Sequence, residues 1–137
     1  MTPMACSGAV LYAKNVTGLK HFYQSLLALN DESIHVATDH VAINTPTFQL
    51  VLVEVPADVA AYIVIENPPR TRSEVPVKLV FDVPSIADAR VVSAHNGGEV
   101  LPEAREWNFD AFRVCDGRDP EGNVIQLRQQ RDHFAPG

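Results

Sequence analysis

The chain has 137 residues, of which 46% are hydrophobic and 20% charged, and its formal net charge at pH 7 is −6. This length and composition predict a single globular domain with its own hydrophobic core. The acidic balance argues against nucleic-acid and anionic-membrane partners, because both need clustered lysines and arginines. No stretch approaches the roughly 20 apolar residues of a membrane span, and the first residues lack a basic start followed by an apolar run, so we expect a cytoplasmic protein.

The first half of the chain has a βαβββ order of patterns. Residues 8–13 alternate as in a strand, and a helix follows with Thr17 as its expected N-cap. The apolar face of that helix repeats with a helical period and comprises Leu19, Phe22, Tyr23, Leu26 and Leu27. Two short runs, 33–37 and 40–44, predict a hairpin, and 47–54 predicts a longer strand.

The second half repeats this order. A helix is predicted to begin at Ser85, because Asp88 follows three residues later as in a capping box. It is expected to run to about His95 and to end at Gly97-Gly98, where glycine adopts the left-handed conformation. The predicted strands are 77–83, 99–101, 111–116 and 124–129, with a tight turn over 119–123 before the last of them.

The two halves also resemble each other residue by residue. Gly8-Ala-Val-Leu-Tyr-Ala-Lys-Asn-Val16 aligns with Lys78-Leu-Val-Phe-Asp-Val-Pro-Ser-Ile86, and Phe48-Gln-Leu50 repeats as Ile125-Gln-Leu127. Such doubling predicts one cavity built from two equivalent sets of residues. The predicted parts of the single domain 1–137 are a module over 8–54, a connector over 55–76 with one helical turn near 57–62, a module over 77–129 and a tail over 130–137.

Two segments carry a family resemblance. Leu11-Tyr-Ala-Lys-Asn-Val16, followed by His21-Phe-Tyr23 and Leu26-Leu27, is similar to the opening of the vicinal oxygen chelate superfamily. Asp116-Gly-Arg-Asp-Pro-Glu-Gly-Asn-Val-Ile-Gln-Leu127 is similar to its second signature. This superfamily contains glyoxalase, bleomycin resistance proteins and extradiol dioxygenases, and the resemblance covers about residues 8–129.

The resemblance implies an α+β fold of two tandem βαβββ modules. Each module has a curved sheet whose concave face lines a cleft and whose convex face carries the helix. The resemblance also implies a homodimer, and unpaired edge strands with exposed apolar surface favour the same assembly. It leaves the activity open, because this fold serves metal enzymes, metal-free drug-binding proteins and immunity proteins.

Strand alternation predicts which side chains line the cleft, since successive residues point to opposite faces of a sheet. The more apolar set should face the helices and comprises Ala9, Leu11, Ala13, Phe48, Leu50, Leu52, Leu79, Phe81, Val83, Ile125 and Leu127. The opposite set should line the cleft and comprises Gly8, Val10, Tyr12, Gln49, Val51, Val53, Lys78, Val80, Asp82, Val124, Gln126 and Arg128.

The positions that would bind a metal in this family carry poor ligands. The resemblance places the family's His, Glu and Gln ligands at the positions of Gly8, Gln49, Lys78 and Gln126. Glycine has no donor atom, a lysine ammonium has no lone pair, and neutral amides bind divalent transition metals weakly. We therefore predict no metal at this site and no cofactor. His35 and His40 could be neighbours across the hairpin and form an alternative site. Zinc sites take three or four protein ligands, and Glu54 is the candidate for the third.

Two functions follow from this cleft. The first is a metal-free protein that binds a small apolar molecule with an anionic or hydrogen-bonding group. Its predicted ligand-binding residues are Tyr12, Gln49, Lys78, Gln126, Arg128 and Trp107. The alternative is a glyoxalase-type lyase or isomerase, or a dioxygenase-like enzyme, with Lys78 as catalytic acid or base.

Two of these residues also have ordinary structural interpretations. Lys78 can be a solvated residue at the end of a strand, paired with Asp82 or a neighbouring acid. Trp107, together with Phe109, is expected in a loop before a strand, where it either forms a wall of the cleft or anchors the loop.

Overall fold

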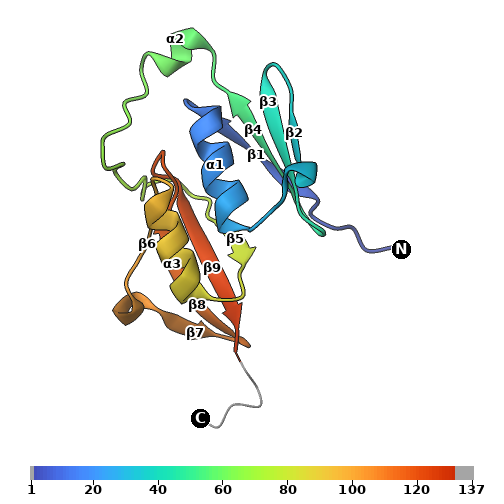
Figure 1. Ribbon diagram of the computed structural model, residues 1–137, viewed down its shortest axis with the longest axis vertical. Helices are drawn as coiled ribbons and strands as arrows, with labels where there is room; N and C mark the ends of the chain where they lie inside the picture. Colours follow the sequence, from blue (N-terminus) through green and yellow to red (C-terminus); the bar gives the residue numbers. More distant parts are fainter. Residues whose placement is uncertain (1, 132–137) are drawn as a thin grey trace. The chain divides into compact units, whose positions relative to one another are not determined.

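The computed structural model describes residues 2–131 and divides the chain into two compact units (Figure 1). The first unit ends at Val64 and the second begins at Ile65. Each has mixed α+β structure, with a sheet and a helix packed on one face of it. The prediction that both halves belong to one domain stays a prediction. No helix in the described part of the chain is long and apolar enough to cross a lipid bilayer.

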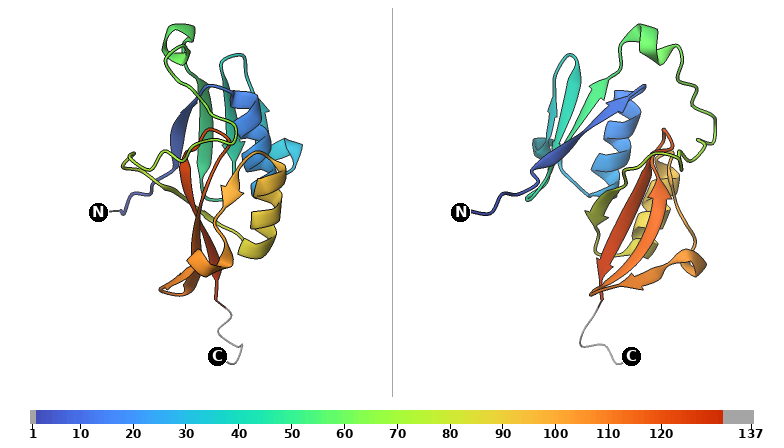
Figure 2. Two further views of the ribbon diagram at one scale, coloured as in Figure 1. Left: turned by 90° about the vertical axis from the view of Figure 1, so that its left-hand side faces the viewer. Right: turned by 180° about the vertical axis from the view of Figure 1, so that it is seen from behind.

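The first unit has the predicted βαβββ order. Its elements are β1 (Gly8–Ala13), α1 (Val16–Leu26), the 3-10 turn η1 (Asp31–Ser33), β2 (Ile34–Val36), β3 (His40–Asn44), β4 (Gln49–Glu54) and the short α2 (Ala57–Ala60). The sheet order is β1-β4-β3-β2, with β1 parallel to β4 and the other neighbours antiparallel. Helix α1 packs on β3 and β4, as Figures 1 and 2 show.

The N-cap of α1 differs from the prediction. The Asn15 side chain, rather than that of Thr17, accepts a hydrogen bond from the backbone N–H of Gly18 at 3.0 Å. Thr17 lies inside the helix, which begins at Val16, so its hydroxyl is too late in the chain to cap the first turn. The predicted apolar face is confirmed for Leu19, Phe22, Tyr23 and Leu26, which are buried, whereas Leu27 is the half-buried C-cap residue after the helix.

The second unit contains one more strand than predicted. Its elements are β5 (Leu79–Asp82), α3 (Ile86–His95), β6 (Glu99–Val100), the 3-10 turn η2 (Glu103–Arg105), β7 (Trp107–Phe109), β8 (Phe112–Arg118) and β9 (Val124–Gln130). The sheet order is β5-β9-β8-β6, and β7 pairs with β8. The predicted loop around Trp107 and Phe109 is wrong, because both lie in β7. All three residues of β7 are exposed, so no buried–exposed alternation marks this strand.

Local signals placed both ends of α3 correctly. The Ser85 hydroxyl accepts a hydrogen bond from the backbone N–H of Asp88 at 3.1 Å. At the other end Gly97 has a φ of 85°, and the Gly98 N–H donates to the carbonyl of Ser93 at 3.0 Å. The buried residues of α3 are Ile86, Ala89 and Ser93.

The alternation of faces is confirmed in both sheets. Leu50, Leu52, Phe81, Ile125 and Leu127 are buried on the helix-covered faces. The residues predicted for the opposite face, here called the open face, are all exposed or half-buried. The open face of each sheet is therefore where a ligand can reach side chains.

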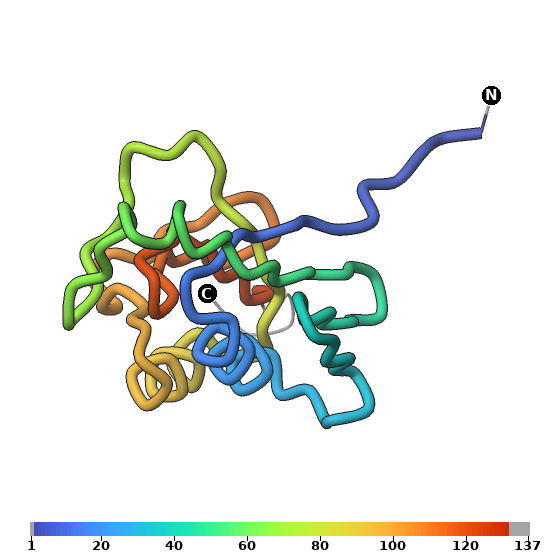
Figure 3. Tube along the Cα trace, turned by 90° about the horizontal axis from the view of Figure 1, so that it is seen from above, coloured from blue at the N-terminus to red at the C-terminus, as the bar shows by residue number. Residues whose placement is uncertain are grey.

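The connector and the last turn meet within the second unit. After α2 the chain runs without regular structure until β5 (Figure 3). The Arg72 N–H donates to the Gly122 carbonyl at 2.8 Å, and the buried Asp119 carboxylate accepts hydrogen bonds from the backbone N–H groups of Glu121 and Asn123. Gln130, predicted as part of the tail, belongs to β9, and residues 132–137 of that tail lie outside the described residues.

Candidate functional site

A cavity of about 320 Å³ lies in the second unit, between the open face of its sheet and the connector. The sheet and its loops contribute Glu99, Leu101, Asp116, Gly117, Arg118 and Val124. The irregular segment before β5, which extends the connector to Lys78, contributes Thr71, Ser73, Val75, Pro76, Val77 and Lys78, and is called the connector from here on. The wall is mostly apolar, and the volume is at the lower end of the roughly 300–1,000 Å³ of ligand pockets. A small ligand with one ring or a short chain fits this space.

The polar wall of the cavity contains a tight ion pair. Lys78 Nζ lies 2.8 Å from Asp116 Oδ2, with the two side chains 40% and 24% exposed. Of the two partners considered from the sequence, Asp82 or a neighbouring acid, the second is found. Asp82 lies four residues further along an extended chain, roughly 13 Å away. Asp116 was not among the predicted site residues.

Polar contacts continue from this ion pair along the open face, in a row of side chains here called the polar line. Asp116 Oδ1 accepts a hydrogen bond from Gln126 Nε2 at 3.5 Å, and Gln126 Oε1 accepts one from Arg128 Nε at 3.1 Å. Asp116 and Gln126 are partners across β8 and β9, which explains their contact. Three predicted residues, Lys78, Gln126 and Arg128, are thus connected through one that was missed.

Aromatic rings surround the far end of this line. The Arg128 guanidinium lies 5.0 Å from the ring centre of Phe109 and 5.6 Å from that of Phe112, within cation–π range. Trp107 pairs with Val114, which in turn pairs with Arg128, so Trp107 lies on the open face and is 38% exposed. Trp107 is therefore exposed on the same face as Arg128, although it is not among the residues that line the cavity.

The remaining predicted residues belong to the first unit. Tyr12 is 65% exposed, and Gln49 Nε2 donates to Asn44 Oδ1 at 3.0 Å. Both lie on the open face of their own sheet, as predicted. The prediction that Tyr12 and Gln49 share one cleft with the residues of the second unit stays a prediction.

Solved structures with this arrangement of elements come from several bacteria. The chain is similar to a glyoxalase/bleomycin resistance protein from Albidiferax ferrireducens T118, with 20% identity and a TM-score of 0.63 over 91% of this chain and 98% of that one. It is also similar to a glyoxalase/bleomycin resistance protein/dioxygenase family enzyme from Burkholderia phytofirmans PsJN, with 14% identity and a TM-score of 0.65 over 90% and 97%.

A third neighbour is the genomically encoded fosfomycin resistance protein FosX from Listeria monocytogenes, with 13% identity and a TM-score of 0.63 over 93% of this chain and 94% of that one. This chain has the glyoxalase/bleomycin resistance fold. The superfamily resemblance seen in the sequence is thereby confirmed for the fold, which alone is conveyed at identities this low. No protein-family model and no curated protein matches the sequence.

At the position where this fold can carry its first metal ligand, the backbone leaves no room for a side chain. Gly8 is paired with Gln49, and a Cβ built on Gly8 would lie 2.2 Å from the Gln49 carbonyl oxygen. Glycine is therefore required here while β1 and β4 keep this register. The second unit differs at the equivalent positions. Gln126, the counterpart of Gln49, pairs with Val80, whereas Lys78, the counterpart of Gly8, precedes β5. The strand pairing is therefore shifted by two residues between the two halves.

The alternative histidine set of this glyoxalase-like chain is also dispersed. The His35 and His40 rings are 6.5 Å apart between centres, and His40 Nδ1 contacts Asp39 Oδ1 at 2.8 Å. That hydrogen bond lowers the pKa of Asp39. His40 pairs with Val53, so Glu54 points to the opposite face. Among residues 2–131, no group of three or more His, Cys, Asp and Glu side chains is placed to hold a metal ion.

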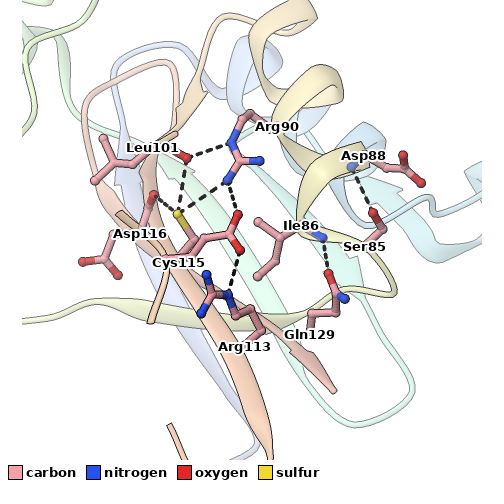
Figure 4. Close-up of polar contacts among 10 residues, drawn as sticks. Ser85, Ile86, Asp88, Arg90, Leu101, Arg113, Cys115, Asp116 and Gln129 are labelled. Carbon is pink, nitrogen blue, oxygen red and sulfur yellow. Dashed lines mark hydrogen bonds and ion pairs between the residues drawn. The ribbon is translucent and has the colours of Figure 1, made fainter. Parts of the chain in front are cut away.

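A half-buried charge cluster occupies the other face of the second sheet. Arg90 of α3 and Arg113 of β8 donate to the Glu106 carboxylate at 2.7 and 2.9 Å (Figure 4). Burial by itself would raise the pKa of Glu106, but the hydrogen bonds from both arginines lower it by more than that, so the pKa lies below its ordinary value. Burial raises the pKa of the neighbouring Cys115 thiol, which makes that thiol a poor nucleophile. This cluster ties the Glu103–Phe109 region to α3 and is structural.

Proposed function

We propose that this chain is a metal-independent protein that binds a small apolar molecule with an anionic or hydrogen-bonding group. The observation that supports this is the largely apolar cavity of about 320 Å³, whose wall carries the Lys78–Asp116 pair. Of the proposed ligand-binding residues, Lys78 lines the cavity. The others lie on the open faces outside its lining: Gln126, Arg128 and Trp107 in the second unit and Tyr12 and Gln49 in the first.

The alternative function is a glyoxalase-type lyase or isomerase, or a dioxygenase-like enzyme. It assigns Lys78 the role of acid or base. The Lys78 ammonium already lies 2.8 Å from the Asp116 carboxylate, so this ion pair would have to open before Nζ could reach the reacting atom of a substrate. This pairing favours ligand binding over proton transfer.

We expect the protein, after dialysis against EDTA, to contain no stoichiometric transition metal by elemental analysis and still to be stabilised by small apolar compounds. The measurement is a thermal-shift screen of one-ring and short-chain acids, amides and alcohols. Val77→Trp should abolish the shifts, because Val77 lines the cavity and is 65% exposed, so a larger side chain can occupy the space without disturbing the core.

The matched control is Val91→Trp, since Val91 is 59% exposed on α3 and does not line the cavity. Its shifts should equal those of the wild type. Equal shifts for Val77→Trp would place binding outside the cavity, and about one chelator-resistant metal per chain would overturn the metal-independent function.

We further propose that the protein is a cytoplasmic homodimer. β1 and β2 are the outer strands of the first sheet, and the open face at β1 exposes Val10 by 58% and Tyr12 by 65%. A second copy would cover this apolar surface. Sedimentation equilibrium at micromolar concentration should give twice the chain mass of 15.0 kDa, whereas a monomer mass over the whole concentration range would contradict the dimer.

A further inference from the structure

We propose that Arg118 is the anion-recognising residue of the cavity in the second unit, and that the ligand is a carboxylate with a small apolar body. This inference rests on the proposed binding function and specifies the ligand class. Arg118 lies in the segment Asp116–Leu127 that carries the family resemblance, but the sequence assigned it no role in binding, and it lies beyond the polar line of Lys78, Asp116, Gln126 and Arg128.

The guanidinium of Arg118 has more donors than partners. A guanidinium has five N–H donors. In Arg118, Nη1 donates one marginal hydrogen bond, of 3.5 Å, to Thr71 Oγ1. Its Nε is buried and has no hydrogen-bond partner among the described residues. The side chain is only 19% exposed, so little solvent replaces the missing partners. Unsatisfied buried donors are costly. Because Nε itself is fully buried, a bound anion would pair with the N–H groups at the accessible end of the guanidinium.

The nearest acid neutralises Arg118 poorly. Glu99 Oε1 is 3.6 Å from Arg118 Nη1, and the Glu99 side chain is 50% exposed. By contrast, Lys78 lies 2.8 Å from its own carboxylate partner. Of the two cations that line the cavity, Arg118 therefore has the charge that is less compensated and less screened by water.

The position of Arg118 suits a ligand with one charged end. Arg118 on β8 is paired with Glu99 of β6 on one side and with Val124 of β9 on the other. Its planar fork matches the two oxygens of a carboxylate. Val75, Val77 and Val124 line the same cavity and would contact the apolar body.

Glu99 then acts against the ligand. Its carboxylate lines the cavity beside Arg118, so it competes for the guanidinium and repels an incoming anion. Removing the charge of Glu99 should strengthen anion binding, while removing the charge of Arg118 should weaken it. Opposite effects of two adjacent substitutions are not expected from a general loss of structure.

The test is isothermal titration of the full chain with benzoate and with benzamide, a neutral molecule of nearly the same shape. We expect benzoate to bind the wild type at least about tenfold more tightly. Arg118→Gln should weaken benzoate binding roughly ten- to a hundredfold, the range for a hydrogen bond to a charged group, and should affect benzamide less. Glu99→Gln should tighten benzoate binding, and Arg118→Lys should restore only part of the affinity because the fork is lost.

The control is Arg105→Gln, which removes one charge from an exposed residue of η2 outside the cavity and should leave benzoate affinity unchanged. Circular dichroism checks that each variant is folded, and Glu99→Gln, at a half-exposed side chain, tests the inference even if Arg118→Gln is unfolded. Equal binding of benzoate and benzamide, or unchanged benzoate affinity in Arg118→Gln and Glu99→Gln, would overturn the inference alone. If neither these probes nor any compound of the thermal-shift screen binds, the proposed function fails with it.

Discussion

Replacing Gly122 with alanine is expected to lower the free energy of unfolding by about 2 to 5 kcal/mol. Gly122 has a φ of 84°, and an alanine in this left-handed conformation costs roughly 1–2 kcal/mol. In addition, the new Cβ would lie 2.0 Å from the carbonyl oxygen of Arg70, an overlap with backbone that adds roughly 1–3 kcal/mol. Urea denaturation of wild type and variant measures the difference.

Gly97→Ala is the matched control for Gly122→Ala. Gly97 has nearly the same φ, 85°, but a Cβ there would meet nothing closer than 3.5 Å. It should therefore lose only the conformational part, roughly 1–2 kcal/mol. If the two alanine variants were equally stable, the close approach of Arg70 to Gly122 would contribute nothing, and the connector would be free to move away from the last turn.

Replacing Glu106 with glutamine is expected to cost about 2 to 4 kcal/mol at neutral pH. Its carboxylate is 10% exposed and accepts hydrogen bonds from both Arg90 and Arg113. Breaking a buried ion pair costs roughly 3–5 kcal/mol, and the lower figure here reflects Arg113, which is 37% exposed and partly screened by solvent. Urea denaturation at pH 7 gives the loss.

The same substitution predicts a pH dependence. The folded pKa of Glu106 is below the ordinary value of 4.5, so the unfolded chain binds the proton more readily. The contribution of Glu106 is therefore fully present above the ordinary value and is lost as the pH falls through the folded pKa. The stability difference between wild type and Glu106→Gln should shrink in that acidic range.

Glu103→Gln is the control for Glu106→Gln. Glu103 is exposed in the neighbouring turn η2, and a change there should stay within roughly 0.5 kcal/mol at every pH. A loss for Glu106→Gln that is as small as this, or one that persists unchanged in acid, would mean that the two arginines do not depend on the Glu106 charge.

Local patterns predicted most of the fold. β1 and both ends of α3 follow from signals within a few residues of each element: strand alternation over 8–13, the Ser85 cap and the glycine after the helix. β7 could not be found in this way, because its residues are all exposed and it is defined only by its pairing with β8. Choosing Asn15 over Thr17 as a cap depended on which side chain reaches Gly18, which the composition does not reveal.

The candidate site was predictable only within single strands. Alternation put Gln126 and Arg128 on one face, but the lateral neighbour Asp116 depends on the register between β8 and β9, which a pattern along one strand does not contain. Arg118 and the cavity were missed for a related reason. Half of the cavity wall comes from the connector, whose residues follow no helical or strand period.

In the binding function proposed above, half of the residues that would contact the ligand lie outside the sheet that stabilises the fold. The connector is fixed where Arg72 bonds to Gly122, while Ser73, Val75 and Val77 contribute exposed side chains to the cavity. Substitutions at these three positions alter the contour and polarity of the cavity without touching the packed faces of the sheet. If the cavity binds a ligand as proposed, a directed library limited to these few positions would sample new specificities on an unchanged scaffold.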